Sequence, residues 1–237
     1  MKDRTLYFIF FLIVIVVSSI LFYMAGNQPQ KAPISILAIG DSLTEGYYKY
    51  GRAFHPYAKR LTELFESANI PVTIKQQGIS GERVVPTMVN RLRRLLNTSA
   101  AYDWVIILGG TNDLADSSKT AEKIFNNGLQ PMYDMCLNNT QTKTKLAVMT
   151  VIENAIFSPV DANDAARQAL NNMIRDYVTK SNEQDRIVLV DLDKGIPYHS
   201  LNSDKERDEI WDDSIHLTPA GYDRIATLVF DAIQSKL

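Results

Sequence analysis

Short, almost entirely apolar segments recur along this chain, and each precedes a segment whose apolar residues have helical spacing. The first, residues 34–39, reads Ile-Ser-Ile-Leu-Ala-Ile, which is typical of a strand buried on both faces. Strands and helices that alternate in this way predict an α/β fold, a parallel sheet with helices on both faces. Right-handed crossovers leave few arrangements for five strands, and we expect the flavodoxin-like order 2-1-3-4-5. The predicted strands are 34–39, 72–76, 104–108, 146–151 and 187–190, and the predicted helices are 56–69, 84–96, 121–137, 165–178 and 219–234.

The amino terminus carries a different signal, because residues 6–24 contain no charge. As a helix rising ~1.5 Å per residue, this run would span roughly 28 Å, close to the hydrocarbon thickness of a bilayer. Lys2 and Arg4 precede it, as expected for a cytoplasmic flank. A cleaved signal peptide is the alternative, but the run is long and ends in bulky residues where signal peptidase needs small ones. We therefore expect a transmembrane anchor.

The predicted domain organisation follows from that anchor. We expect residues 1–25 to form a single N-terminal transmembrane helix, the polar, proline-bearing residues 26–33 to form a linker, and residues 34–237 to form the folded domain. The domain is expected outside the cytoplasm, tethered to the membrane. If the segment is cleaved instead, the domain is secreted.

Composition excludes several classes of partner and site. The formal net charge is −2, so bulk electrostatics draws this chain neither to nucleic acid nor to anionic lipid. Cys136 is the single cysteine, which excludes an intrachain disulfide and a cysteine-based metal site. Its place in a helical pattern indicates a small buried hydrophobe.

Ser42 follows the first predicted strand and Gly40, in the stretch Gly-Asp-Ser-Leu. A glycine there allows a sharp turn, and a helix beginning nearby would direct amide dipoles at the serine. A serine needs an adjacent base to act as a nucleophile. On local sequence alone, a serine that caps a helix is the better interpretation, and only the other motifs favour a nucleophile.

A base would have to be one of three histidines: His55, at a predicted helix start, His199, in a polar stretch, or His216. His216 lies three residues after Asp213 and just before a helix-start signal, a spacing that lets a carboxylate orient the imidazole. We therefore expect His216 as base with Asp213 as its partner. Asp212 is the competing carboxylate, expected to cap the turn.

Two further strand ends carry groups that could stabilise an oxyanion. Gly81 follows the second strand and can offer a backbone N–H, as can Ser42 itself, and Asn112 follows the third strand and can offer its side-chain amide. Either segment alone also fits an ordinary glycine turn or Asx turn. Three consecutive strand ends with one needed group each favour a single acyl-transfer site.

Other segments support weaker expectations. The aromatic-rich residues 45–55 line a binding groove or pack on the core, and residues 156–159 are a second candidate wall. Asp41 and Asp113 are expected to hold loops in shape rather than to react. Residues 198–211 read as a long polar loop. In the helix over 84–96, the arginines are expected on or beside the solvent face; they are Arg91, Arg93 and Arg94.

These motifs together resemble the SGNH hydrolases, also called GDSL lipases or esterases, over residue 34 to the carboxyl end. The resemblance implies that Ser42, His216 and Asp213 form a catalytic triad, with Ser42, Gly81 and Asn112 as the oxyanion hole. It also implies a flavodoxin-like three-layer α/β/α sandwich and metal-independent hydrolysis of esters without a cofactor. Family members act on many esters, so small-molecule, carbohydrate and lipid esters all remain open as substrates.

Two alternatives to a hydrolase stay open. An acyltransferase would use the same triad, with an alcohol in place of water as acceptor of the acyl group. A catalytically inactive, membrane-tethered carbohydrate- or lipid-binding domain is the other, although intact Ser42, Asp213 and His216 speak against it.

Overall fold

A five-stranded parallel sheet forms the centre of the fold, with the strand order β4-β1-β5-β6-β7. The computed structural model describes residues 32–98, 101–116, 118–138, 143–159 and 161–237. Counted along the chain, the sheet order is 2-1-3-4-5, so the predicted order is confirmed. The strands are β1 (Ile34–Gly40), β4 (Val72–Gly78), β5 (Trp104–Ile107), β6 (Lys145–Met149) and β7 (Ile187–Val190).

The apolar strands form this sheet because both of its faces are buried. On β1, alternate residues enter two separate hydrophobic clusters: Leu37 faces one cluster and Ile36 faces the other. The register of β1 on its neighbours pairs Gly40 with Gly78 of β4 and Ile39 with Ile107 of β5. These pairs bring the carboxyl ends of three strands to one edge of the sheet.

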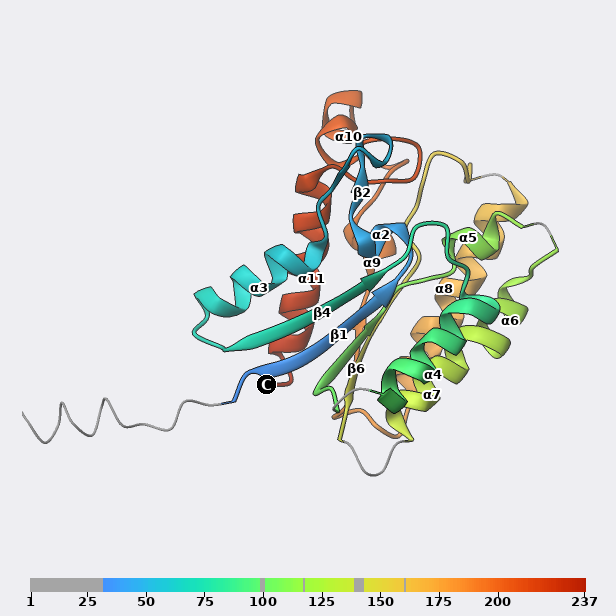
Figure 1. Cartoon of the computed structure of the whole chain (residues 1–237). Coiled ribbons are helices and arrows are strands. Elements are labelled where there is room, and N and C mark those ends of the chain that lie inside the picture. The colour runs from blue at the N-terminus through green and yellow to red at the C-terminus, as the bar shows by residue number, and fades with distance from the viewer. Residues whose placement is uncertain (1–31, 99–100, 117, 139–142, 160) are drawn as a thin grey trace, which may run out of the picture. The chain divides into compact units, whose positions relative to one another are not determined.

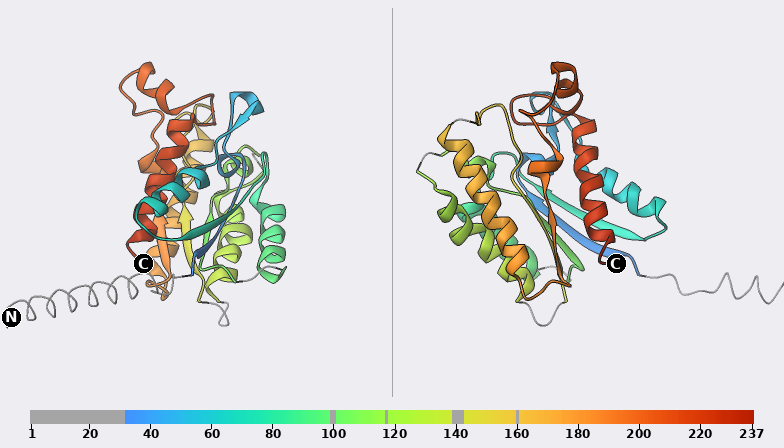
Figure 2. Two further views of the ribbon diagram at one scale, coloured as in Figure 1. Left: turned by 60° about the vertical axis from the view of Figure 1, so that its left-hand side comes forward. Right: turned by 180° about the vertical axis from the view of Figure 1, so that it is seen from behind.

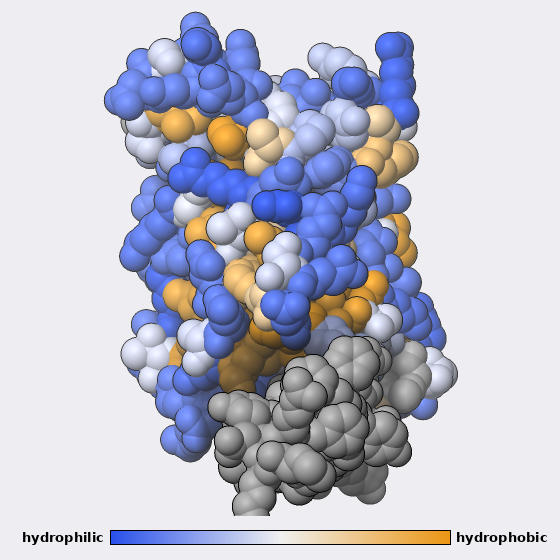
Figure 3. Space-filling view, turned by 90° about the vertical axis from the view of Figure 1, so that its left-hand side faces the viewer, coloured by the Kyte–Doolittle hydropathy of each residue, from blue (hydrophilic) through white to orange (hydrophobic). Residues whose placement is uncertain are grey.

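Helices cover the two faces of the sheet (Figures 1 and 2). α3 (Tyr57–Ser67) and α11 (Pro219–Gln234) pack on one face. α4 (Val89–Thr98), α7 (Gln130–Leu137) and α8 (Ala162–Lys180) pack on the other. Seen from the side of α3 and β4, the outer surface is largely hydrophilic, with hydrophobic residues in the hollows between polar ones (Figure 3). Helices and sheet therefore enclose their apolar sides between layers.

The remaining elements are short, and several lie beyond the carboxyl ends of the strands, above the arrowheads in Figure 1. The short helices are α2 (Ser42–Glu45), α5 (Thr111–Leu114), α6 (Ala121–Ile124), α9 (Leu192–Gly195) and α10 (Asp204–Ile210). β2 (Tyr47–Tyr48) and β3 (Ala53–Phe54) form an antiparallel hairpin. A 3₁₀ turn, Lys49–Gly51, joins them, and π-helical turns occupy Val84–Met88 and Phe125–Leu129.

The structure corrects the predicted helices in three places. The stretch 198–211 contains α10, which has no buried residue and therefore no apolar period; Ser203 caps it by accepting the N–H of Glu206. The predicted helix 121–137 is helical over its whole length, but a π-helical turn lies within it between α6 and α7. The third correction concerns Arg91 of α4, which is buried (8% exposed) rather than on the solvent face, because it pairs with Glu82.

The predicted transmembrane segment 1–25 and most of the linker lie outside the described residues. Pro33–Leu237 form one compact unit. Within the part of the chain that the structure describes, no helix is long and apolar enough to cross a bilayer.

Candidate active site

Ser42 is the first residue of α2, directly after the end of β1. Gly40 makes the sharp turn possible, because a Cβ at that position would lie 2.7 Å from the carbonyl oxygen of Leu108. Asp41 caps α2 by accepting the N–H of Leu43 at 3.0 Å. The serine therefore sits at a helix start, where amide dipoles point toward its side chain.

His216 lies next to Ser42 although 174 residues separate them in the chain. Its Nε2 is 3.0 Å from Oγ of Ser42, and its Nδ1 is 2.9 Å from Oδ2 of Asp213. Asp213 Oδ1 also accepts the backbone N–H groups of Ile215, at 2.8 Å, and of His216, at 2.7 Å. Partial burial raises the pKa of Asp213, but hydrogen bonds and the charge of the imidazole outweigh it and hold that pKa below its usual value. The carboxylate is thus fixed in its charged form against the imidazole.

The other carboxylate and the other histidines have different partners. Asp212 accepts the backbone N–H of Lys49 at 2.6 Å and so fixes the hairpin, whereas the sequence predicted a cap of its own turn. His55 pairs with Asp223 at 2.8 Å. His199 Nε2 lies 3.0 Å from the carbonyl oxygens of both Asn154 and Phe157, so this nitrogen is a donor.

Tyr47 contributes a contact that the sequence did not predict. Its ring packs on the imidazole of His216, with centroids 4.4 Å apart and an interplanar angle of 38°. The backbone carbonyl of Tyr47 accepts the hydroxyl of Tyr222 at 2.6 Å, which ties β2 to α11. An aromatic residue shortly after the Gly-Asp-Ser-Leu stretch was the available signal, but the choice of Tyr47 among several aromatics needed the fold.

Gly81 and Asn112 are linked through Glu82, the residue that follows Gly81 in the chain. Gly81 has φ +75°, and a Cβ there would contact nothing within 4 Å, so the backbone is open on that side. Asn112 Nδ2 donates to the carbonyl oxygen of Glu82 at 3.0 Å and lies 3.5 Å from Oδ2 of Asp41. Asn112 therefore lies between the Gly81 turn and the residue that precedes Ser42.

Asp41 and Asp113 hold loops, as expected. Asp113 accepts the backbone N–H of Val84 at 2.7 Å and of Val85 at 3.3 Å. Burial raises the pKa of Asp113, and burial likewise raises the pKa of the fully buried Asp41 to about 7. Among the described residues, the hydrogen bonds of these two carboxylates go to other partners than His216.

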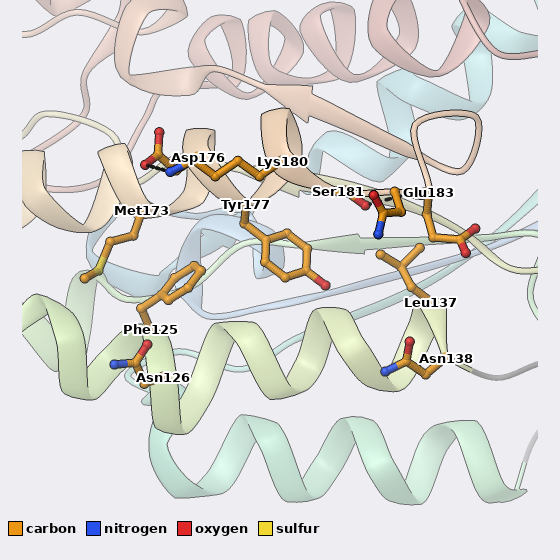
Figure 4. A pocket seen from close by; sticks show the side chains of 11 residues that line it. Phe125, Asn126, Leu137, Asn138, Met173, Asp176, Tyr177, Lys180, Ser181 and Glu183 are labelled. Atoms are coloured by element: carbon orange, nitrogen blue, oxygen red, sulfur yellow. Dashed lines mark hydrogen bonds and ion pairs between the residues drawn. The ribbon is translucent and has the colours of Figure 1, made fainter.

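Two cavities among the described residues have similar volumes. One, of about 590 Å³, adjoins the Gly81 turn; it is lined by residues 79–83, 85–87 and Lys119. The other, of about 550 Å³, lies between α7 and α8 toward the amino ends of β6 and β7, with Phe125, Tyr177 and Lys180 in its wall (Figure 4). Neither cavity has Ser42 or His216 in its wall, and the first is connected to the candidate site through the Gly81 turn. Within the described ranges, His, Cys, Asp and Glu side chains form no group of three or more that could hold a metal ion.

Solved structures share this fold. A lipolytic protein of the G-D-S-L family from Veillonella parvula superposes with a TM-score of 0.66 at 16% identity, covering 85% of this chain and 98% of its own. A family 3 carbohydrate esterase from Clostridium thermocellum gives 0.62 at 22% identity, covering 86% and 96%. An aryl esterase from M. smegmatis gives 0.62 at 19% identity, covering 86% and 100%.

A sequence search against curated proteins finds no match for this chain. The model of the GDSL-like lipase/acylhydrolase family matches residues 38–224, a stretch that includes Ser42, Gly81, Asn112, Asp213 and His216. By this match the chain belongs to the GDSL-like lipase/acylhydrolase family, a family of carboxylic ester hydrolases.

Proposed function

We propose that this protein is a serine esterase that hydrolyses carboxylic esters through an acyl-enzyme intermediate. One observation carries the proposal: Oγ of Ser42 lies 3.0 Å from Nε2 of His216, whose Nδ1 lies 2.9 Å from the carboxylate of Asp213. A nucleophile, a base and a group that orients the base are the parts that acyl transfer requires. The family membership supports the same chemistry.

In the proposed mechanism, His216 Nε2 takes the proton of the Ser42 hydroxyl while the serine oxygen attacks the ester carbonyl carbon. The backbone N–H groups of Ser42 and Gly81 and the amide of Asn112 donate to the oxyanion that forms. His216 then gives its proton to the leaving alcohol oxygen. Water attacks the acyl-enzyme in the same way and releases the carboxylic acid, which regenerates Ser42. These steps need neither a metal ion nor an organic cofactor.

The same mechanism assigns sides to the substrate. The leaving alcohol must reach His216 Nε2, so it lies on the side of Tyr47 and the hairpin. The acyl group then lies toward the Gly81 turn, where the adjoining cavity has Ile79, Val85 and Pro86 among its lining residues. Solved relatives include enzymes described as carbohydrate esterases and an aryl esterase, which supports ring-bearing alcohols as substrates. Small-molecule, carbohydrate and lipid esters all fit this assignment, and nucleic acid does not fit a net charge of −2.

A fluorophosphonate probe and a Ser42→Ala variant test the proposal. We expect the probe to label the wild-type protein, and Ser42→Ala to lose labelling and at least about 10³-fold of kcat on p-nitrophenyl acetate. Ser67→Ala is the matched control, because Ser67 is an exposed serine of α3 that bonds only the carbonyl of Glu63. Labelling of Ser42→Ala at the wild-type rate would contradict the proposal, and so would an unlabelled wild-type protein.

An acyltransferase using the same triad is the alternative, and an added acceptor alcohol separates the two. Hydrolysis alone at high acceptor concentration supports the esterase, whereas transfer of the acyl group to the acceptor supports the transferase. An inactive carbohydrate- or lipid-binding domain predicts neither product and no labelling of Ser42.

We further propose that residues 1–25 anchor the protein in a membrane and that the domain from residue 34 works outside the cytoplasm. The uncharged run 6–24 and the preceding Lys2 and Arg4 support this arrangement. Secretion after cleavage of the segment is the alternative.

A further inference from the structure

The Gly81 turn is held by charged side chains rather than by packing. It follows β4 as a tight turn in which the N–H of Glu82 donates to the carbonyl of Ile79 at 3.1 Å. Ile79 is 47% exposed, and a Cβ at Gly81 would meet nothing within 4 Å. Such a turn has few apolar contacts to fix the direction of its N–H groups. A donor for an oxyanion nevertheless needs its direction fixed to a fraction of an ångström.

Glu82 and Arg91 form an ion pair directly beside Gly81. Their side chains are only 8% and 10% exposed, and Arg91 Nε lies 3.0 and 3.1 Å from the two carboxylate oxygens of Glu82. A second guanidinium nitrogen of Arg91 also bonds Glu82. The planar fork of the arginine thus fixes the carboxylate in one orientation.

The same guanidinium also bonds the ends of two strands. Arg91 donates to the carbonyl of Gln77 on β4 at 2.8 Å and to the carbonyl of Gly40 on β1 at 3.1 Å. Gly40 is two residues before Ser42. One side chain of α4 therefore joins the strand that leads to Ser42, the strand that leads to Gly81, and Glu82.

The backbone of the turn is tied to the other proposed oxyanion donors. The carbonyl of Glu82 accepts the amide of Asn112 at 3.0 Å, and the same amide nitrogen lies at the longer distance of 3.5 Å from Oδ2 of Asp41. On the other side of Gly81, the N–H of Ser80 donates at 2.9 Å to the carboxylate of Glu45, a residue of α2. Residues on both sides of Gly81 are thus bonded to the elements that carry Ser42 and Asn112.

We propose that the Glu82–Arg91 pair is a positioning device that aligns the Gly81 N–H and the Asn112 amide as oxyanion donors. This inference rests on the proposed esterase function. A buried ion pair is weak evidence for a stabilising role, because two apolar residues of similar volume would stabilise as well. An apolar pair, however, could not form the directional hydrogen bonds that fix the Glu82 residue against the ends of β1 and β4.

Glu82→Gln and Arg91→Lys test this role. Each keeps much of the side-chain volume but removes the charged fork, so the donors lose alignment without loss of the substrate pocket. We expect kcat on p-nitrophenyl acetate to fall about tenfold or more, with KM within about twofold of the wild-type value. Phenylboronic acid, which forms a tetrahedral adduct on a catalytic serine, should bind more weakly by a similar factor.

Arg186→Lys is the matched control, because Arg186 also bonds backbone carbonyls, but away from the Gly81 turn: that of Thr144, just before β6, and that of Cys136 in α7. It should lower the melting temperature and leave kcat per folded molecule unchanged. A lower melting temperature with unchanged kcat and boronate affinity in Glu82→Gln would overturn the inference. Because Glu82→Gln is nearly isosteric, it also decides the question if Arg91→Lys does not fold.

Failure of this inference is distinguishable from failure of the proposed function. If Ser42→Ala is inactive and both Glu82→Gln and Arg91→Lys keep the wild-type kcat, only the positioning role is wrong. If Ser42→Ala keeps wild-type activity, the esterase mechanism itself is wrong and the positioning role falls with it.

Discussion

Asp41 precedes the proposed nucleophile and is fully buried, and that burial raises its pKa to about 7. Its partners are the N–H of Leu43 at 3.0 Å and, more distantly, the amide of Asn112 at 3.5 Å. Among the described residues, no arginine or lysine forms an ion pair with the Asp41 carboxylate. The residue therefore shapes the nucleophile turn at the cost of burying an ionisable group.

This burial predicts a specific dependence of stability on pH. Between pH 4 and pH 7 the unfolded chain ionises Asp41 while the folded protein keeps it protonated, so the free energy of unfolding falls as pH rises. Asp41→Asn, which keeps a neutral acceptor for Leu43, should lack this component. Relative to that variant, we expect the wild-type protein to lose up to about 4 kcal/mol across the interval.

Urea unfolding of both proteins at several pH values measures the difference. Asp208→Asn is the control, since Asp208 lies exposed on α10. A difference between wild type and Asp41→Asn that does not change with pH would show that Asp41 ionises normally in the folded protein.

Among elements, the β2–β3 hairpin is the one that the proposed mechanism places beside the leaving alcohol. The sequence left open whether its aromatic residues line a groove or pack on the core. In the structure, Tyr47 is packed and two others are exposed. Tyr47 packs on His216 and pairs with Phe54 across the hairpin, with ring centroids 6.0 Å apart. Tyr50 is 78% exposed and Phe54 is 51% exposed, so these rings remain free to meet a ligand.

Phe54→Ala therefore tests the side assigned to the alcohol. We expect its KM for phenyl acetate and for acetylated sugars to rise about three- to tenfold, because an aromatic contact with a ring is worth about 0.5–1.5 kcal/mol. KM for methyl acetate, which has no ring, should stay within the error of the wild-type value. Equal changes for all three esters would place the alcohol elsewhere.

Helix α4 shows which property of an element the sequence predicts and which it does not. Its helical spacing was predicted correctly over most of its length, but the predicted solvent exposure of Arg91 was wrong. A charged side chain is normally solvated unless a partner desolvates with it. That partner, Glu82, lies in an irregular turn whose position no periodicity describes.

For the whole molecule, the position of the domain relative to a membrane remains a proposal with a direct test. The full-length chain should sediment with membranes and resist extraction by alkaline carbonate. Val14→Arg combined with Val16→Arg should release it, because each arginine at the centre of a spanning helix costs about 2.5–3.5 kcal/mol. Activity per molecule should not change, since the substitutions lie outside the domain that begins near residue 34.

Intact mass resolves the alternative. A mature chain that begins near Ala25 would identify a cleaved signal peptide and a secreted enzyme. A full-length chain in the soluble fraction would contradict both proposals for residues 1–25.

At the scale of the fold, the sequence by itself determined the parallel sheet, its strand order and the positions of the principal helices. These features follow from local patterns, namely apolar runs, helical spacing and right-handed crossovers. The stretches around Ser42, Gly81 and Asn112 and the Asp213–His216 spacing were enough to indicate the family and to name these five residues as one candidate site. Helix α10 escaped prediction because an exposed helix has no apolar period to read.

The tertiary structure alone decided which neighbours these residues have. It placed the Asp212 carboxylate on the backbone N–H of Lys49, brought Tyr47 against the imidazole, and buried Arg91 between two strand ends and Glu82. Ser42 and His216 are 174 residues apart in the chain, and their 3.0 Å contact exists only because the sheet gathers its strand ends. Local patterns report how a segment folds, whereas such contacts depend on the free energy of the whole packed arrangement.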